Sequence, residues 1–196
     1  MGRGRRPGVG RRARAGGGPL RRRARRLPPG VAQRAARLAR RKAASPGPVE
    51  SIRSAGAGEI KALEALQRRA SLVWDEDRPH ILAHPDAIEV PAEHLTAGWV
   101  RVAVRGETIV GFATLLPSHD GAGELDALFV EPDLMRQGIG HELIADLVTL
   151  AREHGLRRIE VTGNPNALRF YAREGFVVDG EVPTRFRPGL RMHLDV

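Results

Sequence analysis

Apolar residues recur at a helical spacing in the segment 59–72. Ile60, Leu63, Leu66 and Ala70 follow one another at steps of three or four residues. This spacing brings them to one face of an α-helix and leaves the opposite face polar. The pattern therefore predicts an amphipathic helix at the start of the patterned part of the chain.

Shorter apolar runs follow this helix, and turn sequences separate them. The runs cover residues 99–104, 108–116 and 124–130, with glycine-containing turns at 105–107 and 121–123. Runs of this length between such turns are typical of β-strands. Because connections this short join neighbouring strands, we expect an antiparallel meander.

Beyond residue 132 the spacing becomes helical again. One stripe is formed by Leu143, Ile144, Leu147, Val148 and Ala151. A glycine at position 155 suits the end of this helix, since glycine tolerates the left-handed cap. The helix joins the strand 124–130 to a further short run at 158–162, so these two strands should be parallel, with a right-handed crossover.

The C-terminal part of the chain predicts a second helix and a closing hairpin. Asn164 is a favoured N-cap residue, and Pro165 can occupy the first helical position without losing a hydrogen bond. Runs at 177–182 and 190–196 predict the hairpin. All these elements together predict an α/β (α+β) fold, with a mixed, mostly antiparallel sheet flanked by helices and one parallel strand pair.

Charge divides the chain near residue 48. Residues 1–48 hold sixteen Lys and Arg residues and no acidic residue, so the formal net charge of +9 for the whole chain leaves −7 on residues 49–196. The basic segment has too few apolar residues to offset the entropy of ordering, so we predict a disordered tail at 1–48 and one domain at 49–196. Two interpretations of the tail stay open. It is either an arm that contacts the phosphates of nucleic acid or lipid, or an accessory extension, including upstream sequence translated from a misassigned start.

Several classes of site find no support in the sequence. The chain has no cysteine, which excludes a disulfide and a thiolate nucleophile. No stretch approaches the roughly 20 apolar residues of a membrane-spanning helix, and the start lacks the apolar region of a secretory signal, so we expect a cytoplasmic protein without membrane insertion. His80 and His84 have the spacing of two metal ligands, but the glutamate of a zinc-binding helix motif is missing, and we expect no metal.

A Gly-Ile-Gly sequence at 138–140 lies between the predicted strand 124–130 and the helix that follows it. The free N–H groups of a first helical turn, together with the helix dipole, form an anion site that suits a pyrophosphate. The sequence lacks Gly-x-x-x-x-Gly-Lys-Ser/Thr, and Leu143 stands where a dinucleotide-binding motif has its third glycine.

Two segments resemble the signatures of the GNAT N-acetyltransferase family. Residues 164–176, with the pattern Asn-x-x-Ala-x-x-x-Tyr-x-x-x-Gly-Phe, resemble motif B of that family. The window Met135-Arg136-Gln137-Gly138-Ile139-Gly140 resembles motif A, which usually reads Gln/Arg-x-x-Gly-x-Gly/Ala. Met135 departs from the usual first residue, but main-chain N–H groups make most of the family's contacts there. The resemblance extends, with gaps, over about 59–196.

The resemblance implies acetyl-CoA as the acyl donor and assigns its contacts. The backbone of Leu128, Phe129 and Val130 would pair with the pantetheine arm like an added strand. Residues 135–140 would wrap the pyrophosphate, with Arg136 adding a cation. Asn164 corresponds to an asparagine that contacts the coenzyme, although it is equally an N-cap.

Tyr171 corresponds to the family's phenol that protonates the departing thiolate. The alternative is a tyrosine that only packs in the core. Phe170 can serve as the core ring of this helix, and Tyr171 is the only tyrosine of the chain, so we predict a catalytic role for it.

Acetyl transfer to an amine also needs a proton acceptor. Glu124 and Asp126 should share one face of their strand because side chains alternate, and Glu124 falls where some members of the family place a glutamate that works through water. Asp126 is the second candidate. Each is also explained as a solvated carboxylate beside a turn.

These observations predict an N-acetyltransferase that uses direct attack of a primary amine, on a small molecule or a peptide, in a ternary complex. The acidic balance of the domain favours a cationic acceptor. The alternative is a nucleic-acid-associated protein that acts through its basic N-terminal arm, with a catalytically silent acyl-CoA-binding domain. The sequence does not predict an oligomeric state.

Overall fold

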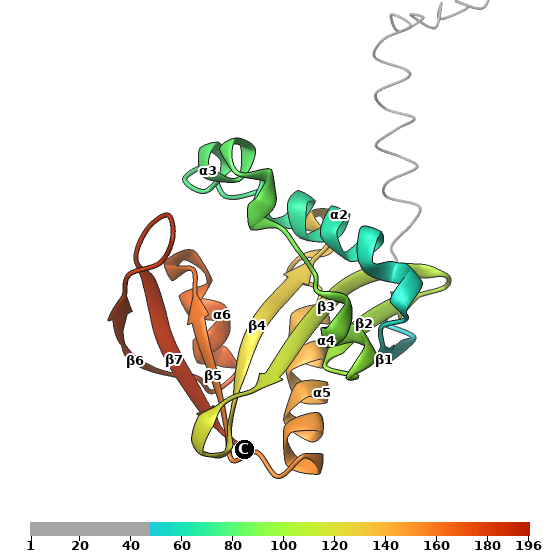
Figure 1. Cartoon of the computed structure of the whole chain (residues 1–196), viewed down its shortest axis with the longest axis vertical. Helices are drawn as coiled ribbons and strands as arrows, with labels where there is room; N and C mark the ends of the chain where they lie inside the picture. The colour runs from blue at the N-terminus through green and yellow to red at the C-terminus, as the bar shows by residue number, and fades with distance from the viewer. Residues whose placement is uncertain (1–47) are drawn as a thin grey trace, which may run out of the picture. The chain divides into compact units, whose positions relative to one another are not determined.

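The computed structural model describes residues 48–196 (Figure 1). The predicted tail at 1–48 lies, except for its last residue, outside the described residues. The described part contains a seven-stranded sheet with the order β1-β2-β3-β4-β5-β7-β6. Its strands are β1 (Ser51–Ser54), β2 (Val100–Arg105), β3 (Thr108–Pro117), β4 (Ala122–Val130), β5 (Arg158–Gly163), β6 (Val177–Val182) and β7 (Gly189–Asp195).

The pairing confirms the predicted fold class. Neighbouring strands run antiparallel, except that β4 and β5 are parallel. The predicted meander corresponds to β2, β3 and β4, and the predicted closing hairpin to β6 and β7. Strand β1 was not predicted, because it is a short polar edge strand that pairs only with β2.

Helices cover the two faces of the sheet. The α-helices are α2 (Ile60–Ser71), α3 (Arg78–Ala83), α4 (Ala92–Thr96), α5 (Ile139–Glu153) and α6 (Leu168–Arg173). Short 3-10 turns are η1 (Ala57–Glu59), η2 (Pro85–Ala87), η3 (His119–Gly121), η4 (Pro132–Leu134) and η5 (Pro165–Ala167). The helix predicted to begin after Asn164 starts as the turn η5, which α6 continues.

Two apolar clusters hold the helices on the sheet. On one face Leu143 and Leu147 of α5 pack with Ile159 of β5. On the other face Leu63 and Leu66 of α2 pack with Phe112 of β3. All six side chains are at most 1% exposed, and burying a side chain of this size contributes roughly 1.5–3 kcal/mol relative to leaving it in water. The apolar stripes predicted from the sequence are therefore the helix faces that are buried against the sheet.

Strands β4 and β5 stay paired over only part of their length. Their register joins residues 122–124 to residues 158–160 and then ends. From Leu125 to Val130, β4 has no strand partner on that side among the described residues. Figure 1 shows the two strands close together near the C-terminus and diverging towards α2 and α3. The separated strands leave backbone hydrogen-bonding groups of β4 open to another extended partner.

A β-bulge in β4 lies where the two strands separate. Leu125 pairs with Leu115 and Ala127 with Thr114, so Asp126 is the extra residue. The bulge changes which residues face each helix: Leu125 belongs to the cluster under α5, but Ala127 belongs to the cluster under α2. The inserted residue breaks the strict alternation from which a shared face of Glu124 and Asp126 was predicted.

Candidate functional site

The loop from β4 to α5 ends in a first helical turn with free amide groups. The N–H groups of Ile139, Gly140 and His141 have no acceptor inside the helix. The loop before them is exposed at Arg136, Gln137 and Gly138. Among described residues, neither Gln137 nor Gly138 donates a backbone hydrogen bond. These amides and the positive end of the α5 dipole together form an anion site.

The conformation of this loop explains its glycine at 138. Gly138 has φ +90°, and Arg136 also has a positive φ of 64°, a region that side chains other than glycine rarely adopt. A Cβ at Gly138 would meet no atom within 4 Å, so backbone conformation and not space requires glycine. The side chain of Gln137 supports the loop by accepting from Arg105 at 3.3 Å and donating to the carbonyl of Asp133 at 3.3 Å.

The two predicted motifs meet at Gly140. A Cβ on Gly140 would lie 3.0 Å from the ring of Phe170, so α6 packs closely against the start of α5. Ile139 is 1% exposed, and its side chain belongs to the core, so only its backbone faces the loop. Leu128 and Val130 likewise pack in the cluster under α5, and Phe129 in the cluster under α2. The predicted contacts of these residues with a cofactor are therefore backbone contacts.

Tyr171 lies at the end of β5 where the strands have separated. A Cβ at Gly163 would lie 2.9 Å from the Tyr171 ring. The rings of Phe170 and Phe176 pack edge to face with it, with ring centroids 5.2 and 5.4 Å from the Tyr171 centroid. The residue is 8% exposed, whereas Phe170 is only partly buried. Phe170 packs against the core as expected, but Tyr171 is itself a core residue and the more buried of the two.

The Tyr171 hydroxyl has a particular environment. Burial raises the pKa of this phenol to about 12, because the phenolate would lose its hydration. The hydroxyl makes no hydrogen bond with the described residues, yet it is not among their buried unsatisfied atoms. Its oxygen therefore keeps an open side, and the group stays protonated at neutral pH.

Asn164 uses its side chain within the protein. Its Oδ1 accepts from the backbone N–H of Asn166 at 2.9 Å, which is the predicted cap of η5. The same oxygen accepts from Arg187 at 3.0 Å, and the Nδ2 donates to Asp77 at 2.6 Å. A direct contact of this side chain with coenzyme stays a prediction.

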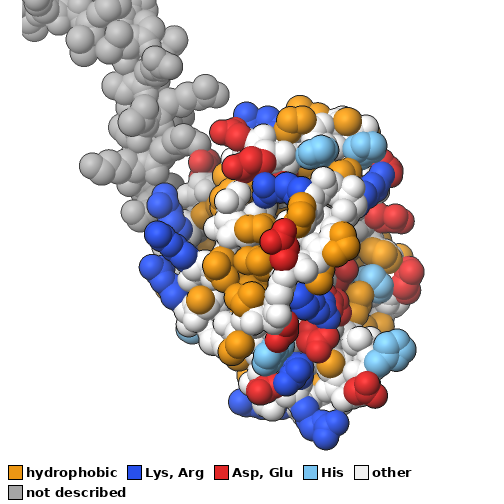
Figure 2. Space-filling model, turned by 90° about the vertical axis from the view of Figure 1, so that its left-hand side faces the viewer, with side chains coloured by type: hydrophobic (Ala, Val, Ile, Leu, Met, Phe, Trp, Pro, Cys, Tyr) orange, Lys and Arg blue, Asp and Glu red, His pale blue; other side chains and the backbone are white. Residues whose placement is uncertain are grey.

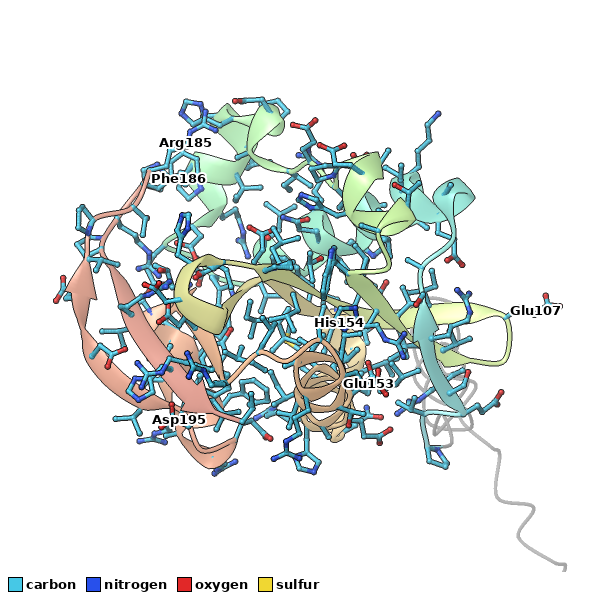
Figure 3. All side chains as sticks on the ribbon, turned by 60° about the horizontal axis from the view of Figure 1, so that its bottom comes forward. Glu107, Glu153, His154, Arg185, Phe186 and Asp195 are labelled. Atoms are coloured by element: carbon cyan, nitrogen blue, oxygen red, sulfur yellow. The ribbon has the colours of Figure 1, made fainter. Side chains whose placement is uncertain are left out.

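The loop between β6 and β7 contacts the segment around α3, and no sequence pattern predicted this contact. Arg187 forms an ion pair with Asp77 at 2.6 Å, and Arg185 forms one with Asp86 at 2.8 Å. Figure 3 shows Arg185 and Phe186 at the tip of this loop beside α3. Figure 2, which views the molecule from the β6 side, shows acidic, basic and histidine side chains intermixed.

The histidines with metal-like spacing also belong to this contact. The rings of His80 and His84 lie 5.2 and 5.3 Å from the ring of Phe186. Among the described residues no group of three or more His, Asp and Glu side chains is arranged to hold a metal ion.

Glu124 is half-buried where β4 and β5 separate. Burial raises the pKa of its carboxyl, and the neighbouring carboxylates Glu160 and Asp126 act in the same direction. Arg191, which is 2.7 Å from a Glu124 oxygen, opposes this effect. Asp126 is exposed at the bulge. Both predicted acceptors thus lie at the separation of the strands, but only Glu124 is held by a neighbouring side chain.

Comparison with known proteins places this geometry in a family. Residues 60–176 match the family model described as the Acetyltransferase (GNAT) family. The chain is 40% identical over 82 residues to the peptidyl-lysine N-acetyltransferase YjaB of Salmonella typhimurium, a match that covers 42% of this chain and 51% of the relative. The chain thus matches about half the length of that curated relative.

Solved structures share the fold. The PaiA N-acetyltransferase of Thermoplasma acidophilum, solved in complex with coenzyme A, has a TM-score of 0.62 at 16% identity and covers 74% of this chain and 98% of its own. A ribosomal-protein-alanine N-acetyltransferase of Brucella melitensis has a TM-score of 0.55 at 24% identity, covering 74% and 99%. None of the helices within residues 48–196 has the length and apolar character needed to cross a membrane. The family model covers more than half of the chain, and the chain therefore belongs to the GNAT acetyltransferase family.

Proposed function

We propose that this chain is an N-acetyltransferase that moves an acetyl group from acetyl-CoA to a primary amine by direct attack in a ternary complex. One observation carries the proposal. The unpaired side of β4, from Leu125 to Val130, leads into a loop whose amides are free at the start of α5, and the ring of Tyr171 lies at the end of the neighbouring strand β5.

The residues present fit the coenzyme. The backbone of residues 128–130 (Leu128, Phe129 and Val130) runs along the side of β4 that has no strand partner among the described residues, and it suits pairing with the amides of a pantetheine arm, as in strand addition. The amides of residues 135–140 suit a pyrophosphate, and the exposed Arg136 adds positive charge near it. When bound, acetyl-CoA supplies an activated acyl group as a thioester.

Tyr171 fits the role of a general acid. Its pKa of about 12 keeps the proton on the hydroxyl oxygen until a sulfur leaving group develops negative charge nearby. Positioned proton transfer of this kind contributes about 10²–10⁴-fold to a rate. The phenol then regains a proton from solvent on the open side of its oxygen.

Glu124 is proposed to receive the proton of the amine, with Asp126 as the second candidate. An amine of ordinary pKa, about 10.4, requires roughly 4.6 kcal/mol for deprotonation at pH 7. The half-buried Glu124 has a raised pKa, which makes it a better proton acceptor than a solvated glutamate. A water molecule between the amine and the carboxylate would complete the transfer.

The acceptor is proposed to be a cationic primary amine, on a small molecule or on a lysine side chain. The curated relative is named a peptidyl-lysine N-acetyltransferase, and residues 49–196 carry a net charge of −7. A negative domain attracts cationic molecules and raises their encounter rate.

Replacement of Tyr171 by phenylalanine tests the proposal. We expect kcat to fall by about 100-fold or more, because the acid is lost, while the Kd for acetyl-CoA changes little because the ring is kept. Released thiol measures turnover with a panel of primary amines, and calorimetry measures the Kd. Equal turnover by wild type and Tyr171→Phe would remove Tyr171 from the mechanism, and a wild-type protein that binds no acetyl-CoA would overturn the proposed function.

A further inference from the structure

Two carboxylates face one another at the last joined position of β4 and β5. Glu124 and Glu160 are direct partners in the parallel register. Opposed residues of neighbouring strands project to the same side of a sheet, so these side chains share one face. Two carboxylates this close repel each other when both are charged. Their arrangement therefore requires a cation.

Arg191 of β7 supplies that cation. Its Nη1 donates to Glu124 and lies 2.8 and 2.7 Å from the two carboxylate oxygens. Its Nη2 donates to Glu160, and Nη1 also donates to the Thr162 hydroxyl at 3.2 Å. The side chains of Arg191, Glu124 and Glu160 are 28, 30 and 27% exposed. The guanidinium thus links three strands at the place where two of them separate.

We propose that Arg191 is a positioning residue that holds the Glu124 carboxylate at the separation of β4 and β5, oriented to take the proton of the amine. This inference rests on the proposed function. Arg191 does not touch the reacting atoms in this role, because it acts through Glu124. A planar guanidinium suits the role, since its fixed donors can hold two carboxylates at once.

The same cluster predicts how the activity depends on pH. The charged groups that act on Glu124 are Asp126 on β4, Glu160 on β5 and Arg191 on β7. A proton acceptor works only in its ionised form, so activity falls as the pH drops through the pKa of Glu124. Arg191 lowers that pKa, so removing it moves the acidic limb of the pH profile to higher pH. Removing Glu160, which raises the pKa and shares the guanidinium, moves the limb to lower pH.

The experiment compares Arg191→Gln, Arg191→Lys and Glu160→Gln with the wild-type full chain. A lysine-containing peptide and acetyl-CoA serve as substrates, and kcat/KM is measured from pH 5 to 10 by thiol release. For Arg191→Gln we expect roughly a tenfold loss of kcat and an acidic limb at higher pH, with an unchanged Kd for acetyl-CoA. Arg191→Lys should recover part of the activity, and Glu160→Gln should shift the limb in the opposite direction.

Arg158→Gln is the matched control. Arg158 also lies on β5 and pairs with a carboxylate, Asp195, at 3.0 Å, with side chains 43 and 72% exposed, but it makes no hydrogen bond or ion pair with Glu124 or Glu160. This variant should keep the wild-type profile. A wild-type profile for both Arg191→Gln and Glu160→Gln would overturn the inference, and so would equal shifts in one direction.

A second readout separates this inference from the proposed function. Carbon-13 NMR of labelled glutamate carboxyls follows the titration of Glu124 without any turnover, with Glu124→Gln identifying its signal. If wild type transfers no acetyl group, the proposed function fails, and the NMR titration still decides whether Arg191 controls Glu124. If wild type is active and Arg191→Gln leaves both the titration and kcat unchanged, only the inference fails. Should Arg191→Gln not fold, Glu160→Gln alone decides the direction of the shift.

Discussion

For the single residue Tyr171, the packing of the ring determines the protonation state of the hydroxyl. Its ring is enclosed by Phe170, Phe176 and the close backbone at Gly163, while its oxygen has no protein partner among the described residues. A phenol in this position cannot ionise easily, because burial reduces the hydration that would stabilise its phenolate. The same packing that stabilises the fold therefore keeps the proton available for transfer.

The titration of Tyr171 can be measured directly, because it is the only tyrosine of the chain. Near-ultraviolet absorbance of the phenolate should show an apparent pKa of about 12 in the folded protein and about 10 after unfolding. The raised pKa contributes stability that is complete below pH 10 and is lost as the pH rises towards 12. The size of this contribution is about 3 kcal/mol.

The variant Tyr171→Phe provides the comparison for stability. Between pH 10 and 12 its free energy of unfolding should decrease less than that of wild type, measured by denaturant titration at each pH. A folded-state phenol that titrates near pH 10 would contradict the buried environment.

The loop between β4 and α5 shows how one element prepares a site. Its left-handed residues at 136 and 138 turn the chain so that consecutive amides precede the first turn of α5. Gly140 then allows α6 to approach through Phe170. The loop is thus shaped by its own backbone on one side and by packing on the other.

Replacing Gly138 by alanine should strain this loop. The φ of +90° costs a residue with a Cβ about 1–2 kcal/mol, although no atom lies near the added carbon. We expect a lower melting temperature and a weaker affinity for coenzyme A, because the loop relieves the strain by leaving the conformation that directs its amides. Differential scanning calorimetry and coenzyme A titration measure the two effects.

Gly58→Ala is the control for that substitution. An added Cβ at Gly58 also meets no atom within 4 Å, and this residue does not have a positive φ. It should leave both the melting temperature and the affinity for coenzyme A close to wild type. If Gly138→Ala binds coenzyme A as tightly as Gly58→Ala does, the left-handed turn is not needed for binding.

At the scale of the whole molecule, the residues of the proposed site belong to the part of the chain that the structure describes. The two apolar clusters of this part use residues from Val49 onwards, and the β4–α5 loop, Tyr171 and Glu124 lie in the same part. The basic residues of the first 48 positions contribute +16 to a chain whose remainder is acidic. We propose that residues 49–196 form the catalytic domain by themselves.

A chain shortened to begin at Val49 tests this division. It should unfold cooperatively and keep wild-type kcat/KM for acetyl transfer, because it keeps both apolar clusters of the described residues. If the first 48 residues act as an arm, the full chain should bind DNA or RNA with a strong dependence on salt, and the shortened chain should not. Loss of acetyl transfer on shortening would contradict the proposed division, and binding by both chains would contradict an arm.

The sequence predicted features that depend on neighbouring residues, but it missed short elements. The stripe at Leu143 and Leu147, the cap at Asn164 and the Gly-Ile-Gly turn were all predicted, because each depends on neighbours within a few residues. Helix α3 was not predicted, since it is a six-residue helix with a proline and a single buried residue. A helix of six residues contains too few apolar positions for a helical spacing to be recognised in the sequence.

The sequence by itself determined the order along the chain of α2, β2 to β4, α5, β5, α6 and the closing hairpin, the parallel crossover and the spacing of the two motifs. Periodicity, turn residues and backbone amides express these features locally. The tertiary structure alone decided the bulge at Asp126, the burial of Tyr171 over Phe170, and the links of Arg191 to Glu124 and of Arg187 to Asp77. Each of these depends on the register and packing of segments far apart in the chain, and no local pattern encodes which distant charge will fill a half-buried position.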